Sequence, residues 1–349
     1  MLTMSTFSAR HRLTSIAQTW RSTIKRSIAP LATAGALLMS CYGAQAQALE
    51  EVTYLLPAPA NLTAFAPWML ALHKGYYKEE GLDVKFVSGR GGVDVAKQVG
   101  AGNAPIGGAI GDTPIIVRAN GIPVKAVAVL GAGSLTLIAT KEDGDLKHVK
   151  ELKGKTATVM AYTDTTYYAF LGSLEKAGLT KQDLDIQAAG PAGIWQLFNS
   201  GRSDAMAGVP DWIVSAENAG AKIRILPQEE TFQSMAQAIL ASEKVIKENP
   251  ELVSKLVRAT LRGMQDIMHD PESATTEYVK AVPAYQGQEA SIRRTFDLYN
   301  QYVYAGQKVP GAIDRDRMEA VQNFYVEQAI VPRAQALDDL YTNTFVPAP

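Results

Sequence analysis

The chain has 349 residues, a formal net charge of −1 and a single cysteine, Cys41. No basic tract follows residue 46, and this argues against a nucleic-acid partner, because such a partner calls for a clustered positive face. One cysteine excludes an intrachain disulfide and a cysteine cluster that would hold a metal ion.

The first 46 residues indicate export. They carry five basic side chains and no acidic one, followed by an apolar run over 28–39 and the triplet "AQA" at 44–46. This pattern is typical of a secretory signal peptide cleaved near Ala46. The apolar run, about a dozen residues, is shorter than the roughly 20 needed to span a bilayer. An alternative is processing at "LMSC", which would leave a lipid on Cys41.

From Val52 onward, short β-rich runs alternate with helical stretches. Strands are expected at 52–57, 82–89, 104–110, 124–131, 135–140, 155–161, 185–190, 204–209 and 222–226. Helices are expected at 67–80, 91–101, 113–120, 165–177, 193–200 and 212–219. Such alternation indicates parallel βαβ units with helices over a sheet. After about Gln237 the pattern changes to long amphipathic helices, as in 249–270.

An internal repeat accompanies this pattern. A shift of 99 residues aligns Gly91 with Gly190, Gly102 with Gly201, Asp112 with Asp211 and Gly121 with Gly220. The order of helix, glycine, strand, aspartate turn and helix is the same in both copies. The repeat predicts two similar α/β lobes. Few identical residues remain, and the alternation of strands and helices common to all α/β proteins is an alternative explanation.

Two such lobes would bring the carboxyl ends of their strands to a shared crevice, the usual ligand position in open α/β sheets. The run 82–88 alternates as a strand does, and "GRGG" at 89–92 is the loop at its carboxyl end. Gly91 permits a close approach of the backbone there, and Arg90 brings a fixed positive charge.

Five segments, taken together and in order, give a resemblance to a known family. They are "PWMLALHKGYYKEEGLDVKFV" (67–87), "QVGAGNAPIG" (98–107), "ANGIPVKAVAVL" (119–130), "VKELKGKTATV" (149–159) and "GRSDAMAGVPDW" (201–212). With them the chain resembles the periplasmic solute-binding proteins of ABC importers, of the nitrate, sulfonate, taurine and pyrimidine-precursor type. The resemblance covers nearly all of the chain after the expected signal peptide.

The resemblance implies an α/β fold of the type II periplasmic-binding-protein class. Each lobe would hold a mostly parallel sheet flanked by helices, with a hinge between the lobes and a C-terminal helical portion. Lobe I would comprise 49–139 and 237–349, and lobe II 142–236. The implied protein is a periplasmic monomer that closes on a small solute and delivers it to a membrane permease, without a cofactor.

The family also has a branch that makes a thiamine pyrimidine as an enzyme, using a histidine and a cysteine-rich iron motif. No cysteine follows residue 46 here, so we expect no such activity and no catalytic residues. The histidines at 73, 148 and 269 are too scattered to form a metal set, and we expect no metal site. An exported enzyme on the same fold remains an alternative.

Two features of the expected crevice could bind an anion. Arg90 could form a bidentate pair with a carboxylate or sulfonate, or could be a solvated loop charge. The helix start at 161–170 offers free backbone N–H groups, to which Thr163, Thr165 and Thr166 could add hydroxyl donors. Asp164 would oppose an anion there unless it points away or caps the helix.

Other candidates have ordinary structural roles as alternatives. Asp112, with Thr113 next to it, and Asp211 stand at expected helix starts, where they could cap a helix or contact a ligand. Asn61 is expected at the crevice edge and Ser134 near a crossover, and ordinary loop roles are the alternative for both. The aromatic residues Phe65, Tyr162 and Trp212 could wall a pocket for a ring or belong to the core. The glycine-rich strand end, Arg90 and the threonine-rich helix start favour an organic anion, a sulfonate or carboxylate, and the aromatic residues favour an aromatic one. A neutral pyrimidine-type thiamine precursor is the alternative ligand.

Overall fold

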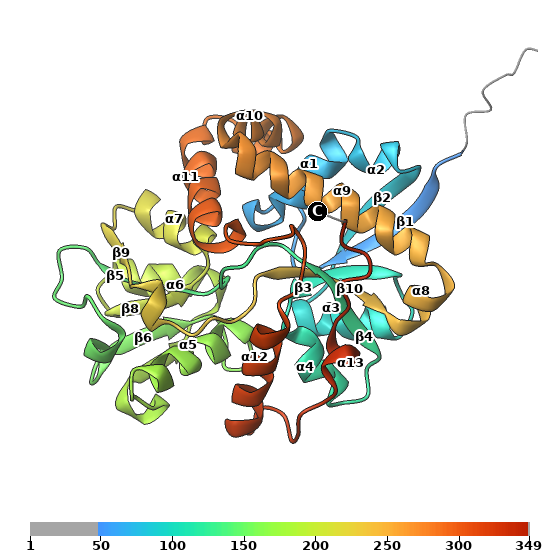
Figure 1. Cartoon of the computed structure of the whole chain (residues 1–349). Helices are drawn as coiled ribbons and strands as arrows, with labels where there is room; N and C mark the ends of the chain where they lie inside the picture. The colour runs from blue at the N-terminus through green and yellow to red at the C-terminus, as the bar shows by residue number, and fades with distance from the viewer. Residues whose placement is uncertain (1–47, 348–349) are drawn as a thin grey trace, which may run out of the picture. The chain divides into compact units, whose positions relative to one another are not determined.

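A computed structural model describes residues 48–347 of the chain, so the expected signal peptide and Cys41 lie outside the described residues. Two five-stranded mixed sheets form two α/β lobes (Figure 1). The strand order is β2-β1-β3-β10-β4 in the first lobe and β7-β6-β8-β5-β9 in the second. The predicted two-lobed α/β architecture is therefore confirmed.

The strands fall close to their predicted positions. They are β1 (Glu50–Leu56), β2 (Leu82–Ser88), β3 (Ile106–Ile110), β4 (Val124–Val129), β5 (Leu137–Lys141), β6 (Thr156–Val159), β7 (Asp185–Ala188), β8 (Ala205–Gly208), β9 (Ile223–Ile225) and β10 (Gln237–Ser242). The sequence did not predict β10. All six of its residues are buried, so it has no polar alternation to mark it as a strand.

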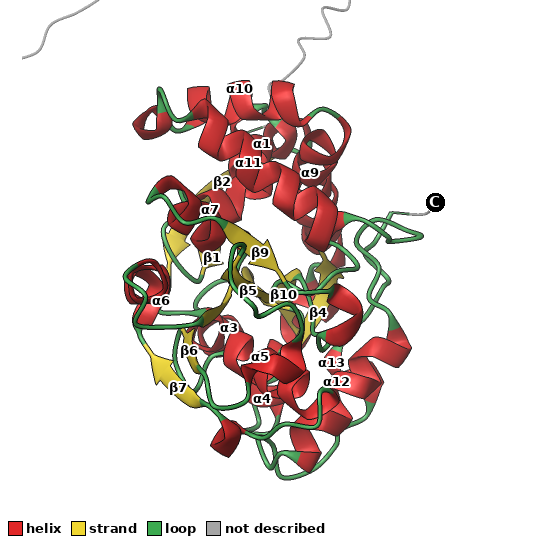
Figure 2. Cartoon of the chain, turned by 90° about the vertical axis from the view of Figure 1, so that its left-hand side faces the viewer, coloured by secondary structure: helices red, strands yellow, loops and turns green. Residues whose placement is uncertain are grey.

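Helices surround both sheets (Figure 2). They are α1 (Ala66–His73), α2 (Tyr76–Glu79), α3 (Gly92–Gly100), α4 (Thr113–Arg118), α5 (Thr165–Lys176), α6 (Gly190–Asn199), α7 (Pro210–Asn218), α8 (Glu243–Glu248), α9 (Pro250–His269), α10 (Pro271–Ala281), α11 (Glu289–Tyr299), α12 (Arg315–Glu327) and α13 (Leu337–Leu340). The helix expected over 67–80 is split at Gly75, whose φ of 80° ends α1. Within residues 48–347 no helix is both long enough and apolar enough to cross a membrane.

The two lobes repeat one topology. In the first lobe β1 runs parallel to β2 and β3, and in the second β6 runs parallel to β7 and β8. The shift of 99 residues carries the first residue of β3 onto that of β8, and the first residue of β4 onto that of β9. The internal repeat in the sequence thus corresponds to two lobes of the same fold.

Each sheet also contains one strand that arrives from the other lobe. Strand β10 enters the first sheet antiparallel to β3 and β4, after the chain has built the second lobe. Strand β5 enters the second sheet antiparallel to β8 and β9, directly after β4 of the first. The chain therefore crosses between the sheets at 130–136 and at 226–236. The lobe boundary expected at 139 falls inside β5, whereas residue 237 is the first residue of β10.

The two crossing segments run side by side. Leu130 N donates to Gln237 O at 2.7 Å, Leu135 N donates to Met235 O at 3.2 Å, and the hydroxyl oxygens of Ser134 and Ser234 lie 2.7 Å apart. These bonds tie the two crossings into one connection between the lobes.

Glycines allow the first crossing to pass under the C-terminal region. A Cβ atom at Gly131 would overlap the Val303 carbonyl, and one at Gly133 would overlap the Tyr302 carbonyl. Both carbonyls belong to a π-helical turn, Asn300–Tyr304, and Gly133 N donates to Val303 O at 2.8 Å. Backbone thus packs directly on backbone at this crossing.

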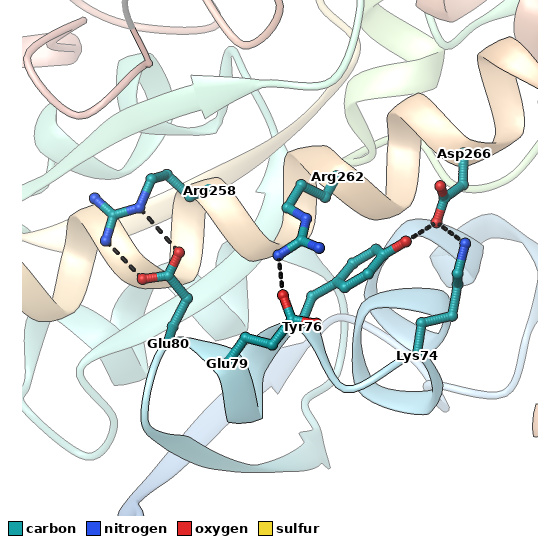
Figure 3. A network of polar contacts seen from close by, with 7 residues as sticks. All are labelled: Lys74, Tyr76, Glu79, Glu80, Arg258, Arg262 and Asp266. Carbon is teal, nitrogen blue, oxygen red and sulfur yellow. Dashed lines mark hydrogen bonds and ion pairs between the residues drawn. The ribbon is translucent and has the colours of Figure 1, made fainter.

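Helix α9 joins the C-terminal region to the first lobe. Its apolar face packs on α1, and its outer face pairs with the segment from α1 to α2 (Figure 3). The polar contacts are Glu80 with Arg258 at 2.7 and 3.0 Å, Glu79 with Arg262 at 2.5 Å, and Asp266 with both Lys74 and Tyr76 at 2.8 Å. Glu79 and Arg262 form an exposed pair, a kind that contributes about 0–1 kcal/mol. Arg258 holds the part-buried Glu80 through two bonds and lowers its pKa.

Two buried carboxylates attach the helices α11 and α12 to the lobes. Asp112 Oδ2, fully buried after β3, accepts a hydrogen bond from Tyr325 Oη at 2.7 Å. Asp211 Oδ2, after β8, accepts one from Tyr299 Oη at 2.8 Å. Burial raises the pKa of Asp112 to about 7 and that of Asp211 to about 6, although the tyrosine hydrogen bonds act in the opposite direction. Residue Asp211 as a whole is only half-buried, but protein encloses its carboxylate.

Gly263→Ala should destabilise the fold. Gly263 lies in α9, where a Cβ atom would overlap the Pro67 carbonyl oxygen of α1. Overpacking of this kind costs about 1–3 kcal/mol, which exceeds the helix propensity gained with alanine. Urea unfolding followed by circular dichroism would measure the loss. Gly144→Ala is the control, because its new methyl group would make an ordinary 3.4 Å contact with Lys141 O. Equal stability of the two variants would contradict this packing.

Asp112→Asn should make stability less dependent on pH. The pKa of an aspartate is about 3.9 in an unfolded chain, and burial raises that of folded Asp112 to about 7. Between these values the folded state holds a proton that the unfolded state releases, so the free energy of unfolding falls as the pH rises. As the pH rises from 4 to 7, the free energy of unfolding of the variant should increase relative to that of the wild type by at most roughly 1.4 kcal/mol per pH unit. Exposed Asp143→Asn is the control, and parallel curves for all three proteins would contradict the prediction.

Candidate functional site

A cleft of about 430 Å³ lies between the lobes, at the carboxyl ends of strands from both sheets. The first lobe contributes residues 57–58 after β1, 90–93 after β2 and Thr113 after β3. The second lobe contributes residues between 160 and 166 after β6, together with Val209 and Trp212 after β8. This is the position at which open α/β sheets bind ligands.

Aromatic and aliphatic side chains make up much of the wall. Phe65 and Trp68 meet edge to face, with ring centroids 6.0 Å apart, and Trp212 and Tyr299 also line the cleft. Trp68 is only 1% exposed, so most of its surface belongs to the core. Walls of this kind suit a flat or apolar body.

Arg90 supplies a positive charge at the cleft. Its loop is held by Gly89 N donating to Leu56 O at 2.7 Å and Gly91 N donating to Pro57 O at 2.9 Å. The backbone N–H of Arg90 donates to Asp94 Oδ2, and this bond helps to lower the pKa of Asp94. The guanidinium is exposed and forms no ion pair within the described part of the chain. It is therefore free to meet an anionic group.

The start of α5 is already capped by a carboxylate of its own chain. Asp164 Oδ1 accepts a hydrogen bond from Thr166 N at 2.9 Å and also contacts the Thr166 hydroxyl. Asp164 therefore caps the helix and does not point away. The expectation that a capping Asp164 would leave the helix start open to an anion is not met, because the cap itself accepts from Thr166 N, one of the N–H groups that an anion would need. The negative charge of Asp164 occupies the place where a helix start would attract an anion. Within the described lining, Arg90 is the remaining source of full positive charge.

The thirteen candidate residues divide into two groups. Those in the cleft lining are Phe65, Arg90, Gly91, Thr113, Thr163, Thr165, Thr166 and Trp212. Those outside the lining are Asn61, Asp112, Ser134, Tyr162 and Asp211.

Most residues of the second group have structural contacts that account for their positions. Asp112 is at the N-cap position of α4 without a capping bond, and Asp211 lies in the first turn of α7, not before it. Both instead accept bonds from tyrosines: Asp112 from Tyr325, which lies outside the lining, and Asp211 from Tyr299, which is part of it. Ser134 links the two crossing segments, and the main-chain carbonyl of Asn61 accepts a bond from Tyr278.

Tyr162 lies in a separate hollow of about 890 Å³ on the second lobe. Residues of α5, of β7 and of 328–330 line that hollow, and no strand end of the first sheet contributes to it. We place the candidate site in the smaller cleft, because only there do strand ends of both lobes converge.

Several lining residues did not stand out in the sequence. Leu135 and Gln237 come from the two crossings, Met160 follows β6, and Tyr299 is the last residue of α11. They are brought to the cleft by the crossings and by the return of the C-terminal region. The one local signal was a polar residue, Gln237, at the head of the apolar run "QAILAS".

Searches for similar proteins identify relatives with two kinds of function. A riboflavin-binding protein, RibY from Chloroflexus aurantiacus, is 27% identical over 308 residues, covering 86% of this chain and 87% of its own. A 4-amino-5-hydroxymethyl-2-methylpyrimidine phosphate synthase from Aspergillus parasiticus is 25% identical over 249 residues, covering 67% of this chain and 71% of its own.

Among solved structures, the periplasmic aliphatic sulphonate binding protein SsuA from Escherichia coli superposes with a TM-score of 0.67 at 16% identity. The superposition covers 86% of this chain and 94% of SsuA, and it shows that the chain has the fold of the type II periplasmic binding proteins. The family model described as NMT1/THI5 like matches residues 62–274. Because that match spans more than half of the chain, the chain belongs to the NMT1/THI5-like family.

Proposed function

We propose that the protein is an extracytoplasmic solute-binding protein that captures a small organic solute between its lobes and delivers it to an ABC permease. The observation that carries this proposal is the cleft, where strand ends of two similar lobes face each other across paired crossings. Two lobes joined in this way can rotate about the crossings and enclose a solute. RibY is named as a binding protein, and SsuA as a periplasmic one, which supports the same role.

The solute should have a flat, aromatic body. Trp212 is the partly exposed ring of the cleft lining, and the largely buried rings of Phe65 and Tyr299 also line it, with apolar contacts from Leu135 and Met160. Burial of an aromatic body, with a few polar contacts, can supply the roughly −8 kcal/mol of a micromolar complex. Arg90 would pair with a carboxylate or sulfonate on such a body.

A second ligand class, a neutral heterocycle, has specific support. Asp164 caps α5 and removes the helix start as an anion site, so the lining holds one positive and one negative side chain. The name of RibY refers to riboflavin, an uncharged ring system, whereas the compound in the synthases' name carries an anionic phosphate on its pyrimidine. Arg90 would then contact a polar edge of the solute, not a full anionic charge.

The protein would release its solute unchanged, although the synthase relatives are enzymes. Residues 1–46 would direct export to the periplasm and would be removed. The mature chain would act as a monomer, since one chain supplies both walls of the cleft.

Arg90→Ala should weaken the binding of an aromatic acid at least tenfold, about 1.4 kcal/mol, because the carboxylate or sulfonate loses its cation. Binding of riboflavin should change less. Isothermal titration calorimetry with benzoate, benzenesulfonate and riboflavin would measure both effects. Arg333→Ala is the matched control, since Arg333 is exposed and does not line the cleft. Unchanged affinity for the acids in Arg90→Ala would remove Arg90 from the site.

A bound solute should be recovered intact. Compounds that bind should first raise the unfolding temperature of the protein, since a ligand at 100 times its dissociation constant adds about 2.7 kcal/mol. Prolonged incubation with such a compound, followed by denaturation and mass spectrometry, should return its original mass in full. Conversion of the compound at a rate proportional to protein concentration would show an enzyme in place of a carrier.

A further inference from the structure

We infer that Gln237 selects solutes that present an N–H or O–H donor, so that the solute is a flat ring with such a group on its edge. This inference rests on the proposed solute-binding function and narrows its ligand class. Gln237 lines the cleft, is 5% exposed and is the first residue of β10. It stands where the second crossing enters the first sheet.

The orientation of the Gln237 amide is fixed by its neighbour. Nε2 donates to the main-chain carbonyl of Ala64 at 2.5 Å, and Ala64 also lines the cleft. Because a carbonyl can only accept hydrogen bonds, a reversed amide would place two acceptors against each other. The remaining amide atom, Oε1, is therefore the one left for a ligand.

Oε1 is buried and has no hydrogen-bond partner among residues 48–347. A buried acceptor left without a partner costs free energy, and that cost is relieved when a donor reaches it. The backbone of Gln237 is held on both sides, because it pairs with Ile110 of β3 and its carbonyl accepts a bond from Leu130. The main chain from which the Gln237 side chain extends is thus held in place in the cleft wall.

Asp164, the carboxylate of the lining, is also an acceptor. Besides threonine hydroxyls, the lining therefore contains two side chains that offer acceptors, Asp164 and Gln237 through Oε1, and one cation, Arg90, between aromatic walls. A ring that carries a lactam or imide N–H, or a phenolic O–H, satisfies this pattern. A ring whose only polar group is a carboxylate or sulfonate leaves Oε1 unpaired. Sites that hydrogen-bond a ligand group discriminate strongly against analogues that lack it.

Matched pairs of compounds test the inference. Riboflavin with 3-methylriboflavin, and 4-hydroxybenzoate with 4-methoxybenzoate, differ in one donor each and keep the same charge. Titration calorimetry should show at least tenfold tighter binding of the donor member by the wild type. In Gln237→Met, a change to an apolar side chain of similar length, the two members should bind with affinities within about twofold.

Gln322→Met is the matched control. Gln322 is also buried and donates through Nε2 to a main-chain carbonyl, that of Gln335, but it lies outside the cleft. This variant should keep the wild-type ratio of affinities, even if it is less stable to heat.

Equal affinities within both pairs for the wild type, or an unchanged ratio in Gln237→Met, would overturn the role of Gln237 while leaving the solute-binding function intact. Absence of binding by all four compounds would count against the proposed aromatic ligand class, and this inference would fail with it.

Discussion

The exchange of strands between the two lobes is the constraint on which the rest of this structure depends. Each sheet is completed by an antiparallel strand that the chain delivers from the other lobe, β10 to the first and β5 to the second. Neither sheet can form fully until the chain has crossed. The crossings then lie side by side, joined by backbone bonds and by Ser134 and Ser234. Because the crossings are adjacent, the strand ends of both lobes face one cleft.

The C-terminal helices α11 and α12 are each attached to one lobe by a hydrogen bond to an aspartate. Asp112 and Asp211 occupy equivalent places in the two repeats, and each accepts a bond from a tyrosine that the C-terminal region provides. The repeated aspartate in the sequence is thus a repeated attachment point. Burial raises the pKa of both carboxyls and so makes stability depend on pH, while the tyrosine hydrogen bonds that hold the helices act against that rise.

Local patterns in the sequence predicted the lobes well, because alternating strands and helices depend on neighbours in the chain. They did not predict β10, whose residues are all buried because the strand lies between two others, so that no polar alternation marks it. In the cleft, Arg90 and the threonines could be predicted since they follow strands directly. Tyr299 and Gln237 could not, because distant segments bring them there. The aspartates at helix starts suggested ligand contacts or caps, and neither reading foresaw their tyrosine partners.

The first crossing passes beneath the turn at Asn300–Tyr304 through two glycines, Gly131 and Gly133, with no room for a side chain. A rotation of the lobes would therefore have to change main-chain torsions at these glycines, where the neighbouring surface is also main chain and has no side chain that could move aside. Side chains that can differ in size are present elsewhere in both crossings, as at Leu135 in the first and at Phe232 and Met235 in the second. Gly131 and Gly133 are therefore the points at which a rotation of the lobes would be most tightly constrained.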